Sequence, residues 1–220
     1  MKKTIKFLAL CSIMLLLITT VYSQNEKFSF GVKVLPGISK ETELISNDYS
    51  LNIGVSLFAV KNFTKTVGVE SGLSYRNYGF QDDITFTNQY GQVIGSGNVR
   101  WSYNYISVPI LLRVNLKSFY FLGGPNLNIL TSAFIIPPEG IMVSGEEWKK
   151  TEIEDSQGFV IEPTIGFGYQ FNIKNKFGLN LEAFASQTIN GIYDSGDGQI
   201  LNFGLGVGFC YFISPRKTNE

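Results

Sequence analysis

The sequence contains no histidine. Without an imidazole side chain, neither a Ser-His-Asp triad nor the common histidine metal sites can be built. The chain also lacks a P-loop, a paired CxxC motif and EF-hand spacing. We therefore expect no enzymatic activity, no metal and no cofactor.

Cysteine is scarce as well, with Cys11 and Cys210 the two examples. Cys11 lies in a segment that we expect to be removed, so no disulfide can form within the mature chain. Removing the three lysines of that segment leaves 15 positive and 18 negative charges. This balance lacks the basic excess typical of nucleic-acid binding, and we expect no nucleic-acid partner.

The N-terminal residues 1–23 have the features of a secretory signal peptide. They combine a basic start, an apolar stretch and a cleavage site, namely Lys2, Lys3 and Lys6, then Phe7–Thr20, then Val21-Tyr22-Ser23. A membrane-anchoring helix would need about 20 apolar residues, so the apolar stretch favours a cleaved signal. We expect the mature protein to be a single exported domain, residues 24–220.

The rest of the chain lacks long apolar runs and alternates instead. Near the C-terminus every second residue is apolar, with glycine, asparagine or cysteine between: Leu201, Phe203, Leu205, Val207, Phe209 and Tyr211. A β-strand sends successive side chains to opposite faces. One face of this strand is therefore apolar, and the other is small or polar.

Eight such strands are predicted, each of 10 to 15 residues, at about 27–36, 49–60, 67–79, 101–114, 118–130, 157–171, 176–188 and 199–213. Strands of soluble proteins usually have about five or six residues, whereas a tilted membrane strand needs about 9 to 11. The lengths favour a membrane protein.

The connections between the predicted strands alternate, with lengths of 12, 6, 21, 3, 26, 4 and 10 residues. Outer-membrane barrels have short periplasmic turns and longer extracellular loops. The pattern predicts turns at 61–66, 115–117 and 172–175, and outer loops at 37–48, 80–100, 131–156 and 189–198. We predict an all-β fold, an eight-stranded antiparallel up-and-down transmembrane β-barrel in a Gram-negative outer membrane.

The two faces of the predicted strands differ in charge. The face assigned to lipid is uncharged, as in Leu51, Ile53, Val55 and Leu57. The opposite face would line the lumen and carries six charged residues: Lys33, Glu70, Arg76, Arg113, Glu162 and Glu182. Buried ions need partners, and an eight-stranded barrel leaves room for little more than side chains. We expect the six charges to pair as an ionic plug.

Three prolines, Pro109, Pro125 and Pro163, fall within the predicted strands. Proline removes a hydrogen bond from a β-ladder. We therefore expect β-bulges or strand ends at these positions.

One segment, YISVPILLR, carries a tyrosine, alternating apolar residues, a proline and a leucine pair before a base: Tyr105, Pro109, Leu111, Leu112 and Arg113. It resembles a motif of the Bacteroidetes outer-membrane β-barrel family called PorT-like, and Phe121–Pro125 resembles the next strand of that family. The resemblance implies an outer-membrane barrel of eight strands in which prolines are normal. Most members have no assigned activity. The founding member is linked to protein secretion and gliding machinery, a role that this motif does not carry over.

Three functions remain open from the sequence. The first is a structural or interaction protein: a plugged barrel that contacts membrane lipid and presents four loops to an envelope protein, with Trp148 in loop 131–156 as the contact candidate. The second is a small-solute channel or ligand-binding barrel with a charged lumen. The third is a soluble periplasmic barrel that binds lipid in an apolar interior.

Overall fold

The computed structural model describes residues 28–42, 48–87, 90–140, 142–143, 146–174, 176–193, 195 and 197–213. Eight long strands dominate: β1 (Phe28–Glu41), β2 (Asp48–Asn62), β3 (Val67–Thr87), β4 (Val93–Leu116), β5 (Phe119–Ile136), β9 (Phe159–Lys174), β10 (Phe177–Gln187) and β11 (Ile200–Ile213). Three two-residue strands lie between β5 and β9: β6 (Met142–Val143), β7 (Glu146–Glu147) and β8 (Thr151–Glu152). The predicted signal peptide, residues 1–23, lies outside the described residues.

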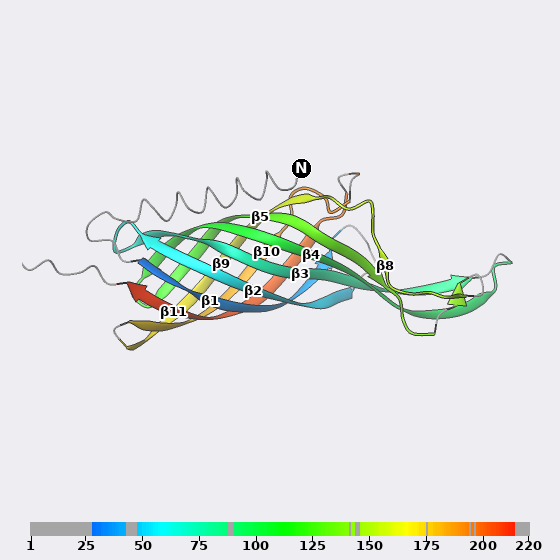
Figure 1. The fold of residues 1–220 in the computed structure, drawn as a ribbon, viewed down its shortest axis with the longest axis horizontal. Coiled ribbons are helices and arrows are strands. Elements are labelled where there is room, and N and C mark those ends of the chain that lie inside the picture. Colours follow the sequence, from blue (N-terminus) through cyan, green and yellow to red (C-terminus); the bar gives the residue numbers. More distant parts are fainter. Residues whose placement is uncertain are drawn as a thin grey trace, which may run out of the picture.

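The eight long strands form a closed ring. Each pairs antiparallel with the long strand before and after it in the chain, and β1 pairs with β11, where Phe28 lies opposite Ile213. Figure 1 shows the tilted strands wrapping around a common axis. The predicted eight-stranded antiparallel barrel is confirmed. Within the described residues, no helix is long and apolar enough to cross a membrane.

The two ends of the barrel have different connections. At one end, here called the turn end, the strands are joined by the short segments 63–66, 117–118 and 175–176. At the other, here called the loop end, the connections are 42–47, 88–92, 137–158 and 188–199. The alternation of longer and shorter connections holds. The loops predicted at 37–48 and 80–100 are much shorter, because the flanking strands leave only 42–47 and 88–92 between them.

The prediction of a loop at 80–100 is wrong. The strands β3 and β4 continue through most of this segment and form a hairpin. The two strands pair from Gln81 opposite Arg100 to Thr87 opposite Val93. Figure 1 shows this hairpin projecting beyond the rest of the barrel. Its glycines and aspartates are typical of a loop, but ladder pairing uses main-chain groups and tolerates such side chains on an exposed hairpin.

The loop predicted at 131–156 is also shortened, because β5 continues to Ile136 and β8 adds to its edge. Trp148 packs edge-on against Phe86 of the β3–β4 hairpin, with ring centroids 5.6 Å apart. The connection 137–158 is therefore held against the hairpin through this aromatic contact.

The apolar face of the strands points outward. Leu51 is 76% exposed, Ile165 70% and Leu205 60%. A soluble barrel would bury this face and carry its charges outside. The soluble lipid-binding alternative is therefore wrong, and the outward belt is the surface that a lipid bilayer would cover.

The expectation of bulges or strand ends is wrong at Pro109 and Pro125, whereas beside Pro163 the β9–β10 ladder does end, with Ser186 opposite Thr164 as its last pair. Pro125 lies directly opposite Pro163 within an unshifted β5–β9 ladder. At Pro109, the β3–β4 ladder loses pairs between Ser71–Ile110 and Ser74–Ser107 but keeps its register. Ser71 Oγ donates instead to the Pro109 carbonyl at 2.8 Å. The missing proline N–H thus interrupts pairing without displacing the strand.

Candidate functional site

The interior next to the turn end holds charged side chains in mutual contact. Lys33 of β1 lies between two carboxylates, with its Nζ 2.5 Å from Glu70 Oε1 and 2.8 Å from Glu182 Oε2. Arg113 of β4 contacts the other oxygen of Glu70, with Nη1 3.0 Å from Oε2. All four residues are 9% exposed or less. Two bases and two acids neutralise each other, which is the condition under which charges can be buried.

Tyr120 of β5 closes these contacts into a ring. Its hydroxyl donates to Glu182 Oε2 at 3.1 Å, and the Arg113 guanidinium carbon lies 3.6 Å from its ring centroid. Arg113 Nη2 also donates to Gln170 Oε1 of β9 at 3.0 Å. We call five residues the charged ring: Lys33, Glu70, Arg113, Tyr120 and Glu182. Side chains from β1, β3, β4, β5 and β10 thus meet across the lumen.

Glycines on adjacent strands provide the space for the charged ring. A Cβ at Gly206 would collide with the Glu182 side chain, and one at Gly168 would collide with the Tyr120 ring. Because interiors are close-packed, the lumen glycines match the bulk of the side chains beside them.

A second polar network lies nearer the loop end, around Glu162 of β9. Tyr78 donates its hydroxyl to Glu162 Oε2 at 2.8 Å and accepts from Arg76 Nη1 at 2.9 Å. Ser186 Oγ donates to the other Glu162 oxygen, and Asn128 Nδ2 lies 3.2 Å from Oε2. We call five residues the Glu162 network: Arg76, Tyr78, Asn128, Glu162 and Ser186. The carboxylate is thus held by donors from β3, β5 and β10.

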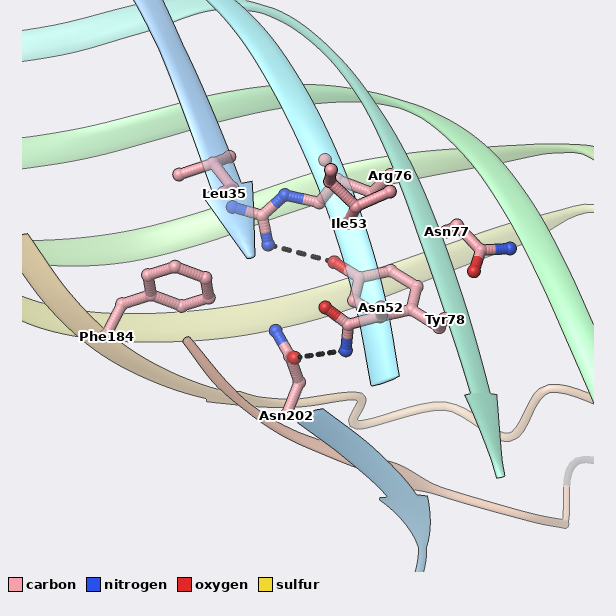
Figure 2. A pocket seen from close by; sticks show the side chains of 9 residues that line it. Leu35, Asn52, Ile53, Arg76, Asn77, Tyr78, Phe184 and Asn202 are labelled. Carbon is pink, nitrogen blue, oxygen red and sulfur yellow. Dashed lines mark hydrogen bonds between the residues drawn. The ribbon is translucent and has the colours of Figure 1, made fainter. Parts of the chain in front are cut away.

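A small cavity lies beside Arg76 (Figure 2). Its volume is about 10 Å³, close to the minimum for one water molecule. Figure 2 shows Arg76 bonded to Tyr78, and Asn52 of β2 bonded to Asn202 of β11; the Asn52 Nδ2 to Asn202 Oδ1 distance is 2.9 Å. The guanidinium carbon of Arg76 lies 5.3 Å from the ring centroid of Phe184. The cavity is too small for an organic ligand.

An apolar layer fills the interior at the loop end. We call its members the aromatic cap: Tyr78, Phe80, Tyr103, Tyr105, Ala133, Val160, Ile192 and Ile200. Phe80 stacks on Trp101 with centroids 4.9 Å apart, and Ile192 is inserted from the connection 188–199 with no exposed surface. From turn end to loop end, the interior thus carries an ionic layer, a hydrogen-bonded layer and an aromatic layer.

The six charged residues singled out from the sequence all lie inside the barrel, in two groups. Lys33, Glu70, Arg113 and Glu182 meet in the charged ring, whereas Arg76 and Glu162 meet in the Glu162 network. Of the PorT-like motif, Tyr105, Pro109, Leu111 and Arg113 point inward, and Leu112 points outward. Among the described residues, no group of His, Cys, Asp and Glu could hold a metal ion.

Sequence reasoning missed Tyr78 and Tyr120, which complete the two networks. Tyr78 is two residues after Arg76 on the same strand, so the alternation already assigned it to the lumen. Tyr120 is the second residue of β5 and lies between outward-facing Phe119 and Phe121. The alternation of inward and outward side chains along a strand was thus enough to place both tyrosines in the lumen.

Comparison with known proteins adds a family and several distant structures. The family model described as "Outer membrane protein beta-barrel domain" matches residues 9–209, which takes in the long strands except the end of β11. No curated protein matches the chain. Neisserial surface protein A is 9% identical over 84% of this chain and 96% of its own, with a TM-score of 0.49. Ail, the attachment invasion locus protein of Yersinia pestis, is 16% identical over 85% and 99%, with a TM-score of 0.44. OprG from Pseudomonas aeruginosa is 12% identical over 86% and 95%, with a TM-score of 0.33.

Proposed function

The chain belongs to the outer membrane protein beta-barrel domain family, and we propose that it is a closed barrel that acts as a structural or interaction protein. The observation that supports this proposal is the succession of three layers of contacting side chains inside the barrel. The charged ring, the Glu162 network and the aromatic cap follow one another along the axis. On this proposal the lumen passes no solute, and the protein has no enzymatic activity.

The interaction surface in this proposal is the loop end. The β3–β4 hairpin projects there (Figure 1), and the connection 137–158 packs on it through Trp148 and Phe86. A surface held by such contacts loses little freedom when a partner binds. We assign it to an envelope protein partner, with Trp148 orienting the connection. We also propose that residues 1–23 are a signal peptide that is cleaved on export.

The PorT-like resemblance is part of the same proposal. Its motif residues have structural contacts: the Pro109 carbonyl accepts from Ser71 Oγ, and Arg113 belongs to the charged ring. These contacts support a role in folding the wall and filling the lumen. They do not point to secretion or gliding.

Planar-bilayer recordings of the folded mature protein test the closed lumen. We expect no conductance steps from the wild type or from Glu70→Gln, because the aromatic cap still closes the interior. Glu147→Gln, at an exposed loop-end site, is the matched control. Ion conductance whose selectivity changes in Glu70→Gln but not in Glu147→Gln would contradict the plug and establish the channel alternative.

Thiol labelling of whole cells tests the assigned loop end. Cys210 is first changed to Ser, and a cysteine is then placed at Val93 on the projecting hairpin or at Lys65 in a turn; both are exposed. An impermeant reagent should label the Val93 site on intact cells and the Lys65 site only after the outer membrane is opened. The reverse pattern would place the hairpin in the periplasm and overturn the interaction surface.

A further inference from the structure

The outside of the turn end carries charge of one sign. Among its described residues, the outward-facing charged side chains are all lysines: Lys61, Lys65, Lys117 and Lys176. The carboxylates of that end, Glu70 and Glu182, are buried in the charged ring. At the loop end the exposed charges are mostly acidic, among them Asp83, Glu139 and Glu154. The barrel is thus electrically polarised along its axis.

Aromatic rings gather at the same end on the outward face of five neighbouring strands, β1, β11, β10, β9 and β5. Neighbouring rings touch: Phe30 and Tyr211 have centroids 5.6 Å apart, Phe177 and Tyr211 5.3 Å, Phe119 and Tyr169 4.9 Å, and Tyr169 and Phe171 4.5 Å. We call these six residues the aromatic collar: Phe30, Phe119, Tyr169, Phe171, Phe177 and Tyr211. Aromatic girdles of barrels lie at the level of lipid headgroups.

The lysines sit just beyond these rings. Lys117 precedes Phe119 by two residues, and Lys176 directly precedes Phe177. Lys61 lies opposite Phe28, two residues beyond Phe30 toward the turn end. Because the rings mark the headgroup level, the ammonium groups lie at the depth of lipid phosphates.

We propose that the turn end binds the phosphate groups of anionic phospholipids, in the leaflet that surrounds the aromatic collar. An ammonium group is a compact positive charge suited to a phosphate, and basic residues at a membrane surface attract anionic lipid. The turns protrude by only a few residues and present lysines around the rim, which fits a ring of separate headgroups. This inference is independent of the partner assigned to the loop end.

Spin-labelled lipids test the proposal. The mature protein is folded into phosphatidylcholine vesicles that contain either spin-labelled phosphatidylglycerol or spin-labelled phosphatidylcholine, and the motionally restricted fraction of each is measured. We expect phosphatidylglycerol to be favoured about twofold or more at low salt, and the preference to fall in high salt because exposed charges are screened.

Three variants assign the preference to the turn end. Replacing Lys61, Lys65, Lys117 and Lys176 with Gln should abolish the preference, and replacing all four with Arg should retain it. The matched control removes four loop-end charges by Lys40→Gln, Arg100→Gln, Lys149→Gln and Lys150→Gln, and should retain the preference. If the fourfold Gln variant fails to fold, Lys65→Gln with Lys176→Gln, both at exposed turn sites, should at least halve the preference.

Three results would overturn the proposal. The first is an unchanged preference for phosphatidylglycerol in the folded turn-end variant. The second is an equal loss in the loop-end control, which would mean that overall charge, and not the lysine rim, selects the lipid. The third concerns the free ion. Millimolar inorganic phosphate should leave the preference unchanged; competition by the free ion at matched ionic strength would instead make the lysines a soluble-anion site and would also overturn it.

Discussion

Lys33 on β1 and Glu70 on β3 form an ion pair that passes over the strand between them, because β2 separates β1 from β3 in the ring. Main-chain hydrogen bonds join only adjacent strands. This contact therefore adds a cross-link inside the curve of the wall. Lys33 makes a second cross-link of this kind to Glu182 on β10, past β11. Lys33 is the residue on which both depend.

Lys33→Met should destabilise the barrel by roughly 3–5 kcal/mol, the usual cost of removing one partner from a buried ion pair. The cost arises because Glu182 keeps only Tyr120 as a partner in the charged ring, and Glu70 keeps only Arg113. Urea unfolding of the micelle-folded protein measures the effect. Lys149→Met, at an exposed site, should change stability by about 0.5 kcal/mol or less. Equal effects would mean that the charged ring contributes no stability.

Gly206→Ala should destabilise the barrel by about 1–3 kcal/mol, the usual cost of overpacking an interior. The added methyl group would collide with Glu182, which the charged ring holds in place. Gly123→Ala is the control, because no atom lies within 4 Å of a Cβ at that glycine. Unfolding midpoints of the two variants provide the comparison, and a larger loss at Gly123 would contradict the assigned role of the lumen glycines.

Leu205→Arg should cost about 2–4 kcal/mol in a bilayer, because this side chain is 60% exposed at the middle of β11 and would place a charge near the membrane midplane. Tyr90→Arg, 78% exposed at the tip of the β3–β4 hairpin, should cost about 0–1 kcal/mol at or beyond the interface. Folding into vesicles, followed by heat-modifiable gel migration, compares the variants. A harmless Leu205→Arg would show that the apolar belt does not meet lipid.

Tyr78→Phe should cost about 1–3 kcal/mol, because it leaves the buried Arg76 and Glu162 without the hydroxyl that joins them. Tyr75→Phe removes a similar hydroxyl on the outward face, where it donates to Asn104 Oδ1 at 3.0 Å in an exposed setting. That control should cost less, about 0.5 kcal/mol, the low end of the net value of an ordinary hydrogen bond. Indistinguishable unfolding midpoints would show that the Glu162 network does not rely on Tyr78.

Alternation was a reliable guide wherever one face meets lipid and the other meets the lumen. In β2, apolar Leu51 and Leu57 alternate with small or polar residues, and both point outward. The same parity placed Glu70 and Arg113 inside. Lipid requires apolar side chains on one face of a membrane strand, and the lumen favours small or polar ones on the other. The alternation in the sequence therefore extends along the whole strand.

Beyond the barrel rim the constraint ends, and sequence reasoning failed there. The hairpin from Gln81 to Arg100 is solvated on much of its surface, so its side chains do not need to alternate. The aromatic cap was missed for a different reason. Tyr103 and Ile192 meet only because the connection 188–199 folds inward, and no local pattern encodes a contact between such distant segments. Pro109 and Pro125 cause no bulge, because a missing N–H removes pairs from a ladder without adding a residue to the strand.

The pairing of β1 with β11 closes the ring of strands, so the folded barrel would have the same ladders if the chain began at a different strand. Phe28 and Ile213 face each other at the turn end, so a short linker between them and a new opening at the 88–92 tip would preserve every ladder. Biosynthesis, however, fixes an order. The first strand made must wait for the last one before its outer edge is satisfied, and a chain interrupted anywhere before residue 200 leaves that edge open to other chains.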